Sequence, residues 1–315
     1  MFSPIVVFGY NRPNHLERSL RAIESNPEAQ QSDIYIFIDG PKAGKANIAI
    51  FEECKAIAEK EYNFGTKKII ARDSNLGLAS SIRTGLDLIF QKYETVIVIE
   101  DDIILASTAL KYLNEGLSIY IDNPTVSSIH SYQYSLNRKL QSCVALRGAD
   151  CWGWATWKDR WESTSFNAAE LLEKIIDRGL VAEFDLNGAM DFSDMLRLQI
   201  DGKIDSWAIC WHASMFLQDR FCIYPPTSLS LNIGMDGSGV HSGIVNIFQT
   251  TLSEDSEWKF PKNISESSEF RELLYQFYSL NKPKRTLFNR IIHRLKTYLK
   301  NQALAYFARK NSTYT

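Results

Sequence analysis

The chain has 315 residues, 45% of them hydrophobic and 12% aromatic, which is enough for one large or two smaller domains with a substantial core. Its five Cys form no CxxC pair and no zinc spacing, which argues against a disulfide framework or a zinc ribbon and favours a reducing cytoplasm. The sequence shows no signal peptide and no run close to the roughly 18 apolar residues of a membrane span, so we expect a cytoplasmic protein without a transmembrane helix.

Strands and helices alternate along the first 130 residues. Apolar, β-branched runs predict strands at 4–11, 33–40, 66–73, 95–102 and 125–132, and helical patterns predict helices at about 13–26, 45–62, 74–93 and 107–121. This alternation is typical of an α/β fold with a mostly parallel central sheet flanked by helices. In such sheets, ligands bind beyond the carboxyl ends of the strands.

The second half is less regular. Residues 147–161 contain four Trp, and they are followed by helical patterns at 168–179, 188–201 and 205–218 and by a short strand near 221–226. Either Asp205 or Ser206 can cap the helix at 205–218. The glycine-rich segment 228–243 has the composition of a mobile loop.

Polar side chains follow four of the predicted strands. They are Asn11 and Arg12, Asp39, Arg72 and Asp73, and the adjacent carboxylates Glu100, Asp101 and Asp102. Three neighbouring negative charges repel one another, and a divalent metal would neutralise them. Mg²⁺ and Mn²⁺ prefer oxygen ligands, commonly one or two carboxylates together with substrate phosphates. The alternative is a solvated acidic turn, or carboxylates that cap the next helix.

Several common phosphate-binding motifs are absent. No GxGxxG follows the first strand, so a dinucleotide-binding fold lacks its fingerprint, and no GxxxxGK[ST] is present. The first strand ends in "GYNR" without an aspartate, which argues against phosphatases that use a nucleophilic Asp there. What remains is a nucleoside diphosphate held by a metal, with its base near the first two strands.

Seven segments occur in the order found in a known family. They are "VVFGYNRP" (6–13), "IFIDG" (36–40), "RDSNLGLASSIRTG" (72–85), "VIVIEDDI" (96–103), "RGADCWGWATW" (147–157), "KIDSWAICW" (203–211) and "SLSLNIGMDGSGVHS" (228–242). With them the chain resembles the GT-A glycosyltransferases, especially the inverting branch that contains the eukaryotic N-acetylglucosaminyltransferase of N-glycan branching and many bacterial surface-polysaccharide transferases. The resemblance covers roughly residues 4–245. It implies a GT-A catalytic domain at 1–250, with a nucleotide-sugar-binding half at 1–130 and an acceptor-binding half at 131–250, followed by a C-terminal extension at 251–315.

The resemblance also implies roles for the acidic triplet. Asp102 would reach Mn²⁺ or Mg²⁺ most directly, while Asp101 and Glu100 would act through water or through hydroxyls of the donor sugar. The metal would bridge the two phosphates and stabilise the departing nucleoside diphosphate as a Lewis acid.

Two further donor-binding residues come from the first two strand ends. Asp39 would accept a hydrogen bond from a uracil N–H, which favours a UDP-linked donor, and Arg12 would lie near the base or the phosphates. The alternatives are a turn aspartate in "DGPK" for Asp39 and a solvated loop arginine for Arg12.

Three more residues complete the expected donor site. Asn75 enters a helix whose N-terminus would face the anionic ligand, although plain helix capping by Ser74 or Asn75 is the alternative. Family members commonly carry Asn where this chain has Arg83, which would contact the donor or face solvent. His241 would bind the diphosphate or complete the metal shell, on a loop that closes over the donor and excludes water.

The acceptor side needs a general base that deprotonates the attacking hydroxyl. The resemblance assigns this role to Asp205, with helix capping as its alternative and Asp191 and Asp194 as the next candidates. The branching enzyme has two consecutive aspartates before the Trp, where this chain has Asp205 and then Ser206. Trp152 and Trp154 would stack on sugar rings, unless they pack in the core.

The C-terminal region is basic. Nine of the 35 Lys and Arg and none of the 37 Asp and Glu lie in residues 281–315, so residues 1–280 carry a net charge of −11. Residues 284–300 combine an apolar helical stripe with basic side chains, which predicts an amphipathic helix on the inner face of the cytoplasmic membrane, where lipid-linked acceptors lie. The alternative is a helix that docks on the domain or forms a homodimer contact. We expect no nucleic-acid partner, because no basic domain supports the tail.

Together these features predict a metal-dependent inverting glycosyltransferase that moves a sugar from a UDP-linked donor to a hydroxyl of a glycan or lipid-linked saccharide. A sugar nucleotidyltransferase is one alternative. It would show a Gly-rich, Arg-containing loop after the first strand, and "GYNRPNH" lacks such a loop. The other alternative is a non-catalytic glycan- or nucleotide-binding protein that uses the Trp cluster.

Overall fold

The computed structural model describes residues 2–236 and 247–281. Residues Met1–Tyr278 form one compact unit and Ser279–Thr315 a second, of which residues 279–281 are described. The amphipathic helix expected at 284–300 therefore lies outside the described residues.

The first unit is built on a sheet of eight strands in the order β3-β2-β1-β4-β8-β6-β9-β7. The strands are β1 (Ile5–Gly9), β2 (Asp33–Ile38), β3 (Thr66–Ala71), β4 (Thr95–Glu100), β6 (Val126–His130), β7 (Val144–Arg147), β8 (Trp154–Trp157) and β9 (Phe221–Tyr224). β3, β2, β1 and β4 are parallel neighbours, while β8 runs antiparallel to β4 and β6, and β7 antiparallel to β9. The predicted α/β fold with a mostly parallel sheet is confirmed, and the antiparallel strands come from the second half.

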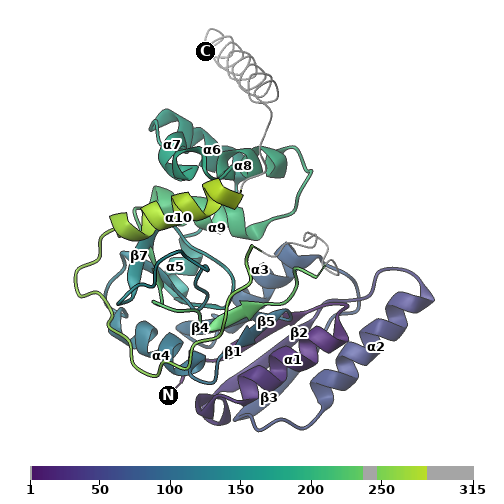
Figure 1. The fold of residues 1–315 in the computed structure, drawn as a ribbon. Helices are drawn as coiled ribbons and strands as arrows, with labels where there is room; N and C mark the ends of the chain where they lie inside the picture. The colour runs from purple at the N-terminus through teal and green to yellow at the C-terminus, as the bar shows by residue number, and fades with distance from the viewer. Residues whose placement is uncertain (1, 237–246, 282–315) are drawn as a thin grey trace, which may run out of the picture. The chain divides into compact units, whose positions relative to one another are not determined.

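Helices cover both faces of the sheet (Figure 1). They are α1 (Pro13–Glu24), α2 (Lys45–Glu59), α3 (Leu78–Ile89), α4 (Ala109–Ile119), α5 (Lys158–Glu162), α9 (Trp207–Leu217) and α10 (Ser268–Asn281). Three further helices, α6 (Ala168–Asp177), α7 (Val181–Phe184) and α8 (Phe192–Ile200), pack with α9 in a separate cluster. Successive side chains of a strand point to opposite faces, so in β1 Ile5 and Val7 pack with α1, α2 and α4, while Val6 and Phe8 pack with α3 and α9. Burial on both faces explains why the first four strands are uniformly apolar.

A small second sheet holds the segment that follows the acidic triplet. β5 (Ile103–Leu105) pairs antiparallel with β10 (Ser230–Asn232). The expectation of a mobile loop over 228–243 is therefore wrong for its first residues. "SLSLN" alternates polar and apolar residues as a strand does, Leu229 is fully buried, and the glycines begin only at Gly234.

The compact unit extends past residue 250, where we expected the catalytic domain to end. Trp258 and Phe260 pack against the main core, and the ring of Tyr112 on α4 lies 5.1 Å from the first and 5.3 Å from the second. Phe270 on α10 is fully buried. Residues 251–278 thus complete the core of the unit, because Trp258 and Phe260 cover α4 while Phe270 packs against Tyr224 on β9.

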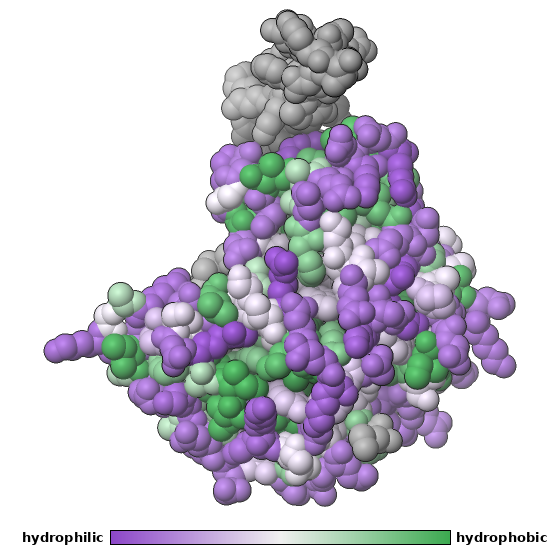
Figure 2. Space-filling view, turned by 180° about the vertical axis from the view of Figure 1, so that it is seen from behind, coloured by the Kyte–Doolittle hydropathy of each residue, from purple (hydrophilic) through white to green (hydrophobic). Residues whose placement is uncertain are grey.

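In the described part of the chain, no helix is long and apolar enough to cross a membrane. Hydrophilic residues cover much of the face shown in Figure 2, and hydrophobic residues occur between them in smaller groups.

Candidate active site

A cleft of about 430 Å³ opens at the carboxyl ends of β1, β2 and β4. Eight of its lining residues are ones to which the sequence assigned a candidate role: Arg12, Asp39, Asn75, Glu100, Asp101, Asp102, Trp152 and Asp205. They come from both halves of the chain. The parallel strands bring the first six together, because their carboxyl ends meet at one edge of the sheet.

Arg12 is a positive partner of the acidic triplet. Its guanidinium donates a hydrogen bond to Asp101 Oδ1 and lies 2.9 Å from Asp102 Oδ2. The backbone N–H of Tyr10 donates to the other oxygen of Asp101, at 3.2 Å. Asp101 is buried beneath the cleft, whereas 14% of the Asp102 side chain is exposed to it. One arginine thus faces three carboxylates.

The charges of the triplet are only partly compensated. Desolvation, with the nearby charges of Asp102 and Asp101, raises the pKa of Glu100 to about 8. Burial also raises the pKa of Asp101 to about 6, although the charge of Arg12 opposes this shift. Both shifts mean that the ionised forms of the Glu100 and Asp101 carboxyls are disfavoured in this environment unless another cation is bound.

The residues at this edge fit a hard divalent cation. Asp102 opens into the cleft, and Gly234 lies so close above it that an added Cβ would overlap Asp102 Oδ2. In residues 2–236 and 247–281, no group of three or more His, Cys, Asp or Glu is arranged to hold a metal by itself. One carboxylate completed by phosphate oxygens and water is a common way for proteins to bind Mg²⁺.

Asp39 organises the turn that leads into α3. Its two carboxylate oxygens accept four hydrogen bonds, from the backbone N–H groups of Gly40, Leu76 and Gly77 and from the amide of Asn75, at 2.9–3.0 Å. A carboxylate has about four acceptor positions, so these donors use all of them. A uracil N–H would have to displace one, and the Asn75 side chain is the most easily moved.

The N-terminus of α3 lies at the cleft. Leu78 and Ser81 of its first turn line the cleft, and its N-cap, Gly77, has no side chain that could cap it. The first N–H groups of this helix are therefore available to an anion.

Asp205 is not used as a helix cap. The N-cap of α9 is Ser206, whose hydroxyl accepts from the N–H of Ile209. Asp205 is exposed and lines the cleft. Within the described ranges, no hydrogen bond or ion pair holds its carboxylate. This leaves it able to accept a proton from a bound hydroxyl.

Two of the other candidates, Trp154 and Arg83, do not line the cleft. Trp152 lines the cleft, but Trp154 is 0% exposed in a core cluster with Trp161, Trp207 and Trp211, so no ring face is open to a sugar. Arg83 lies 4.5 Å over the ring of Phe166 and is not part of the cleft wall.

Three more candidates are not placed at the cleft. Asp194 pairs with Arg197 at 2.9 Å on α8, and neither it nor Asp191 lines the cleft. His241 lies outside the described residues.

Sequence reasoning missed one residue of the wall, Lys42, and one contact, between the glycine-rich segment and Asp102. Lys42 lines the cleft near Tyr10 and adds a positive charge. Residues 232–235 reach Asp102 because the N–H of Ile233 donates to the Asp102 carbonyl, at 2.9 Å. The turn "DGPK" after β2 could have indicated Lys42. The contact between Ile233 and Asp102 depends on the pairing of β5 with β10, which the sequence does not show.

No family model matches the chain, and no curated protein does. Solved structures with partial similarity include S. aureus TarS 1–349, at 10% identity over 73% of this chain and 60% of that chain, with a TM-score of 0.39. Another is the mannosyltransferase PcManGT from Pyrobaculum calidifontis in complex with GDP-Man and Mn²⁺, at 11% identity over 69% of this chain and 70% of that chain, with a TM-score of 0.35. S. aureus TarS matches at 14% identity over 47% of this chain with a TM-score of 0.29, and the match spans a quarter of TarS.

Proposed function

We propose that the chain is a metal-dependent inverting glycosyltransferase of GT-A fold, which moves a sugar from a UDP-linked donor to a hydroxyl of a glycan or lipid-linked saccharide. One observation carries the proposal. The acidic triplet, the Asp39 turn and the carboxylate of Asp205, which no described residue engages, all line a single cleft. Such a site combines a place for a nucleoside diphosphate with a proton acceptor.

The donor side of the cleft is suited to an anionic ligand. Arg12 and Lys42 provide positive charge, and the uncapped N-terminus of α3 provides backbone N–H groups. Asp39 fixes the turn at Asn75–Gly77 and so holds this helix end at the cleft. The base of the nucleotide would lie against this turn, near the ends of β1 and β2.

Asp102 would hold the metal, with Glu100 and Asp101 behind it. When bound, Mn²⁺ or Mg²⁺ would offset the negative charge that develops on the departing diphosphate. Arg12, which already bridges Asp101 and Asp102, keeps the triplet together and would add positive charge where the phosphates bind.

Asp205 would act on the acceptor. Its carboxylate takes the proton of the attacking hydroxyl while the hydroxyl oxygen forms a bond to the anomeric carbon. The bond from that carbon to the diphosphate breaks on the opposite face, so the configuration inverts in a single displacement. The products are the glycoside, a nucleoside diphosphate and a protonated Asp205, which returns its proton to water.

The test uses the purified full-length chain, Mn²⁺ and a panel of nucleotide sugars, with thermal shift and release of nucleoside diphosphate as readouts. We expect a UDP-sugar with Mn²⁺ to raise the Tm and to be turned over. Asp102→Asn should lose the Mn²⁺-dependent part of both signals, whereas Asp73→Asn, an exposed carboxylate on the same edge outside the cleft, should keep them.

Equal behaviour of Asp102→Asn and the wild type would contradict the metal assignment. Release of pyrophosphate from a nucleoside triphosphate and a sugar phosphate would identify a nucleotidyltransferase instead. Binding of the donor without turnover, unchanged by Asp205→Asn, would identify a non-catalytic binding protein.

A further inference from the structure

A second cavity, of about 260 Å³, lies in the half of the chain that follows β6. Its walls are mostly aromatic and apolar, and they include Phe184, Phe192, Tyr134, Tyr224 and Tyr278. Asp150 is a polar group within this apolar surface. A concave apolar pocket with a few convergent polar groups is the usual form of a small-molecule site.

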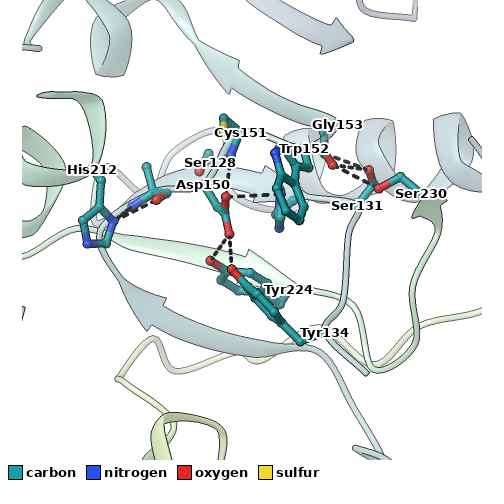
Figure 3. A network of polar contacts seen from close by, with 12 residues as sticks. Ser128, Ser131, Tyr134, Asp150, Cys151, Trp152, Gly153, His212, Tyr224 and Ser230 are labelled. Carbon is teal, nitrogen blue, oxygen red and sulfur yellow. Dashed lines mark hydrogen bonds and ion pairs between the residues drawn. The ribbon is translucent and has the colours of Figure 1, made fainter. Parts of the chain in front are cut away.

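Asp150 is held in place by neutral donors. The hydroxyls of Tyr134 and Tyr224 donate to its Oδ2 at 3.0 and 3.1 Å, and the backbone N–H of Cys151 donates to its Oδ1 at 2.8 Å (Figure 3). These bonds use three of about four acceptor positions on the carboxylate. One position on Oδ1 remains, and 20% of the side chain is exposed.

His130 does not neutralise this carboxylate. Its Nε2 lies 3.9 Å from Asp150 Oδ1, but the same nitrogen accepts a hydrogen bond from the N–H of Trp152, at 3.0 Å, and so carries no proton. Burial lowers the pKa of His130, which keeps the ring neutral. In the described part of the chain no Lys or Arg forms an ion pair with Asp150. A half-buried carboxylate without a cationic partner stabilises a ligand that can donate to it.

The loop that carries Asp150 is rigidly built. Gly148 has φ +109°, and an added Cβ would overlap the ring of His212 on α9. The Nδ1 of that ring lies 2.8 Å from the Ala149 carbonyl oxygen, so α9 anchors the loop directly before Asp150. At the other end, Gly153 has φ +78° and packs on Ser131. Figure 3 shows Asp150 between His212 on one side and Trp152 on the other.

This cavity adjoins the candidate active site. Trp152 lines both, and Ser206, which lines the cavity, directly follows Asp205, which lines the cleft. α9 therefore links the two sites. Asp205 directly precedes its N-cap, and His212 on this helix holds the loop that carries Asp150. A ligand in the cavity would lie against the same Trp152 that lines the cleft.

We propose that this second cavity binds a sugar ring of the acceptor, through a hydroxyl or ammonium group that donates to Asp150 and through an apolar ring face that packs on the aromatic walls. This proposal rests on the proposed function, because the cavity would then place the acceptor chain beside Asp205.

An anionic ligand fits the cavity poorly. Asp150 would repel it, and the two arginines in the wall are already engaged. Arg147 pairs with Glu183 and Asp219, at 2.9 and 2.6 Å, and Arg271 with Glu266, at 3.4 Å. A neutral or cationic sugar avoids this repulsion, and aromatic side chains attract both C–H faces and ammonium groups.

The experiment measures binding directly, by saturation-transfer NMR on the full-length protein with three probes. They are methyl glucoside, methyl glucosaminide with a free amine, and methyl glucoside with all hydroxyls methylated. We expect the first two to bind and the third to bind at least about tenfold more weakly, because it leaves Asp150 without a donor. Preference for the glucosaminide would identify an ammonium as the donor, and equal binding would identify a hydroxyl.

Two variants and a control test the assignment. Asp150→Asn should weaken binding of the first two probes about tenfold or more. Ala208→Phe, which adds an aromatic ring at a position of the cavity wall on α9, should abolish it. Asp122→Asn, an exposed carboxylate away from the cavity, should bind like the wild type. Circular dichroism and Tm would confirm that each variant is folded.

The proposal would be overturned if none of the probes bound, if the methylated probe bound equally well, or if both variants bound like the wild type. The Mn²⁺-dependent thermal shift with a UDP-sugar separates the two proposals. It should persist in Asp150→Asn, whereas its absence from the wild type would count against the proposed function and not against a sugar site in this cavity.

Discussion

Asp205 lies beside Gly77 in the wall of the cleft, since a Cβ added to Gly77 would lie 3.6 Å from Asp205 Oδ2. Gly77 precedes the first turn of α3, and Asp205 precedes α9, which packs on the same face of the sheet. The contact joins the first half of the chain, which forms the parallel strands, to the second half, which supplies the candidate base. A hydroxyl held by Asp205 would therefore lie next to a donor whose phosphates face α3.

This arrangement predicts a kinetic role for Asp205. Asp205→Asn should lower turnover of a UDP-sugar and an acceptor by about 100- to 10,000-fold, because Asn cannot take the proton of the attacking hydroxyl. Binding of UDP with Mn²⁺, measured by calorimetry, should change little. The control is Asn167→Ala, which removes the cap of α6 away from both cavities and should cost about 1 kcal/mol of stability while turnover stays near the wild-type value. A base at another position would leave Asp205→Asn active.

A second prediction concerns the Asp39 turn. Asp39→Ala should lower the free energy of unfolding by about 2–3 kcal/mol, because it leaves several partly buried N–H donors without their charged acceptor. Asp39→Asn should lie between Ala and the wild type, since an amide oxygen can still accept two of the four bonds. Urea unfolding measures the stability, and calorimetry with UDP tests whether nucleotide binding falls in parallel. Stability unchanged in Asp39→Ala would show that the turn does not depend on this carboxylate.

Gly234 leads to a third prediction. A Cβ there would overlap Asp102 Oδ2 and lie 2.9 Å from Arg12 Nη1, so Gly234→Ala should push this pair apart. Turnover should fall roughly 100-fold, as expected for a displaced catalytic group, although the fold is kept. Gly179→Ala is the matched control. Its φ of +69° makes Ala cost about 1–2 kcal/mol, but no atom lies within 4 Å, so its turnover should match the wild type. Full activity of Gly234→Ala would mean that, in solution, residues 232–235 do not stay in contact with Asp102.

The parts of the fold that could be predicted are those written in consecutive residues. Every residue of Ile5–Gly9 in β1 is buried, so the strand is visible as an apolar run, and the same holds for most of β4. The position of β8 between β4 and β6, and the pairing of β5 with β10, could not be predicted. Both depend on partners far away in the sequence, and Trp154–Trp157 gives no local sign of which strands it will join.

The same limit applies to the site. Trp152 and Trp154 are two residues apart and equally aromatic, yet the first lines the cleft and the second is fully buried. Their difference is decided by α9, whose Trp207 and Trp211 cover the ring of Trp154. The capping choice between Asp205 and Ser206 was also open, because both residue types cap helices equally well.

The buried imidazoles predict a pH effect on stability. Burial lowers the pKa of both His130 and His212, so below the ordinary value of 6.5 the unfolded chain binds protons that the folded chain resists. Their contribution to stability is therefore complete above pH 6.5 and is lost as the pH falls from 6.5 toward the lowered values. The raised pKa values of Glu100 and Asp101 act in the opposite direction, so the effect is best isolated by comparing variants.

His212→Gln removes one of the two imidazoles. When the pH falls from 7.5 to 5.5, the free energy of unfolding of this variant should decrease less than that of the wild type. Urea unfolding at the two pH values measures this difference, with His15→Gln, outside the buried pair, as the control. Identical pH responses of wild type and His212→Gln would show that this imidazole is already protonated in the fold or that its pKa is not lowered.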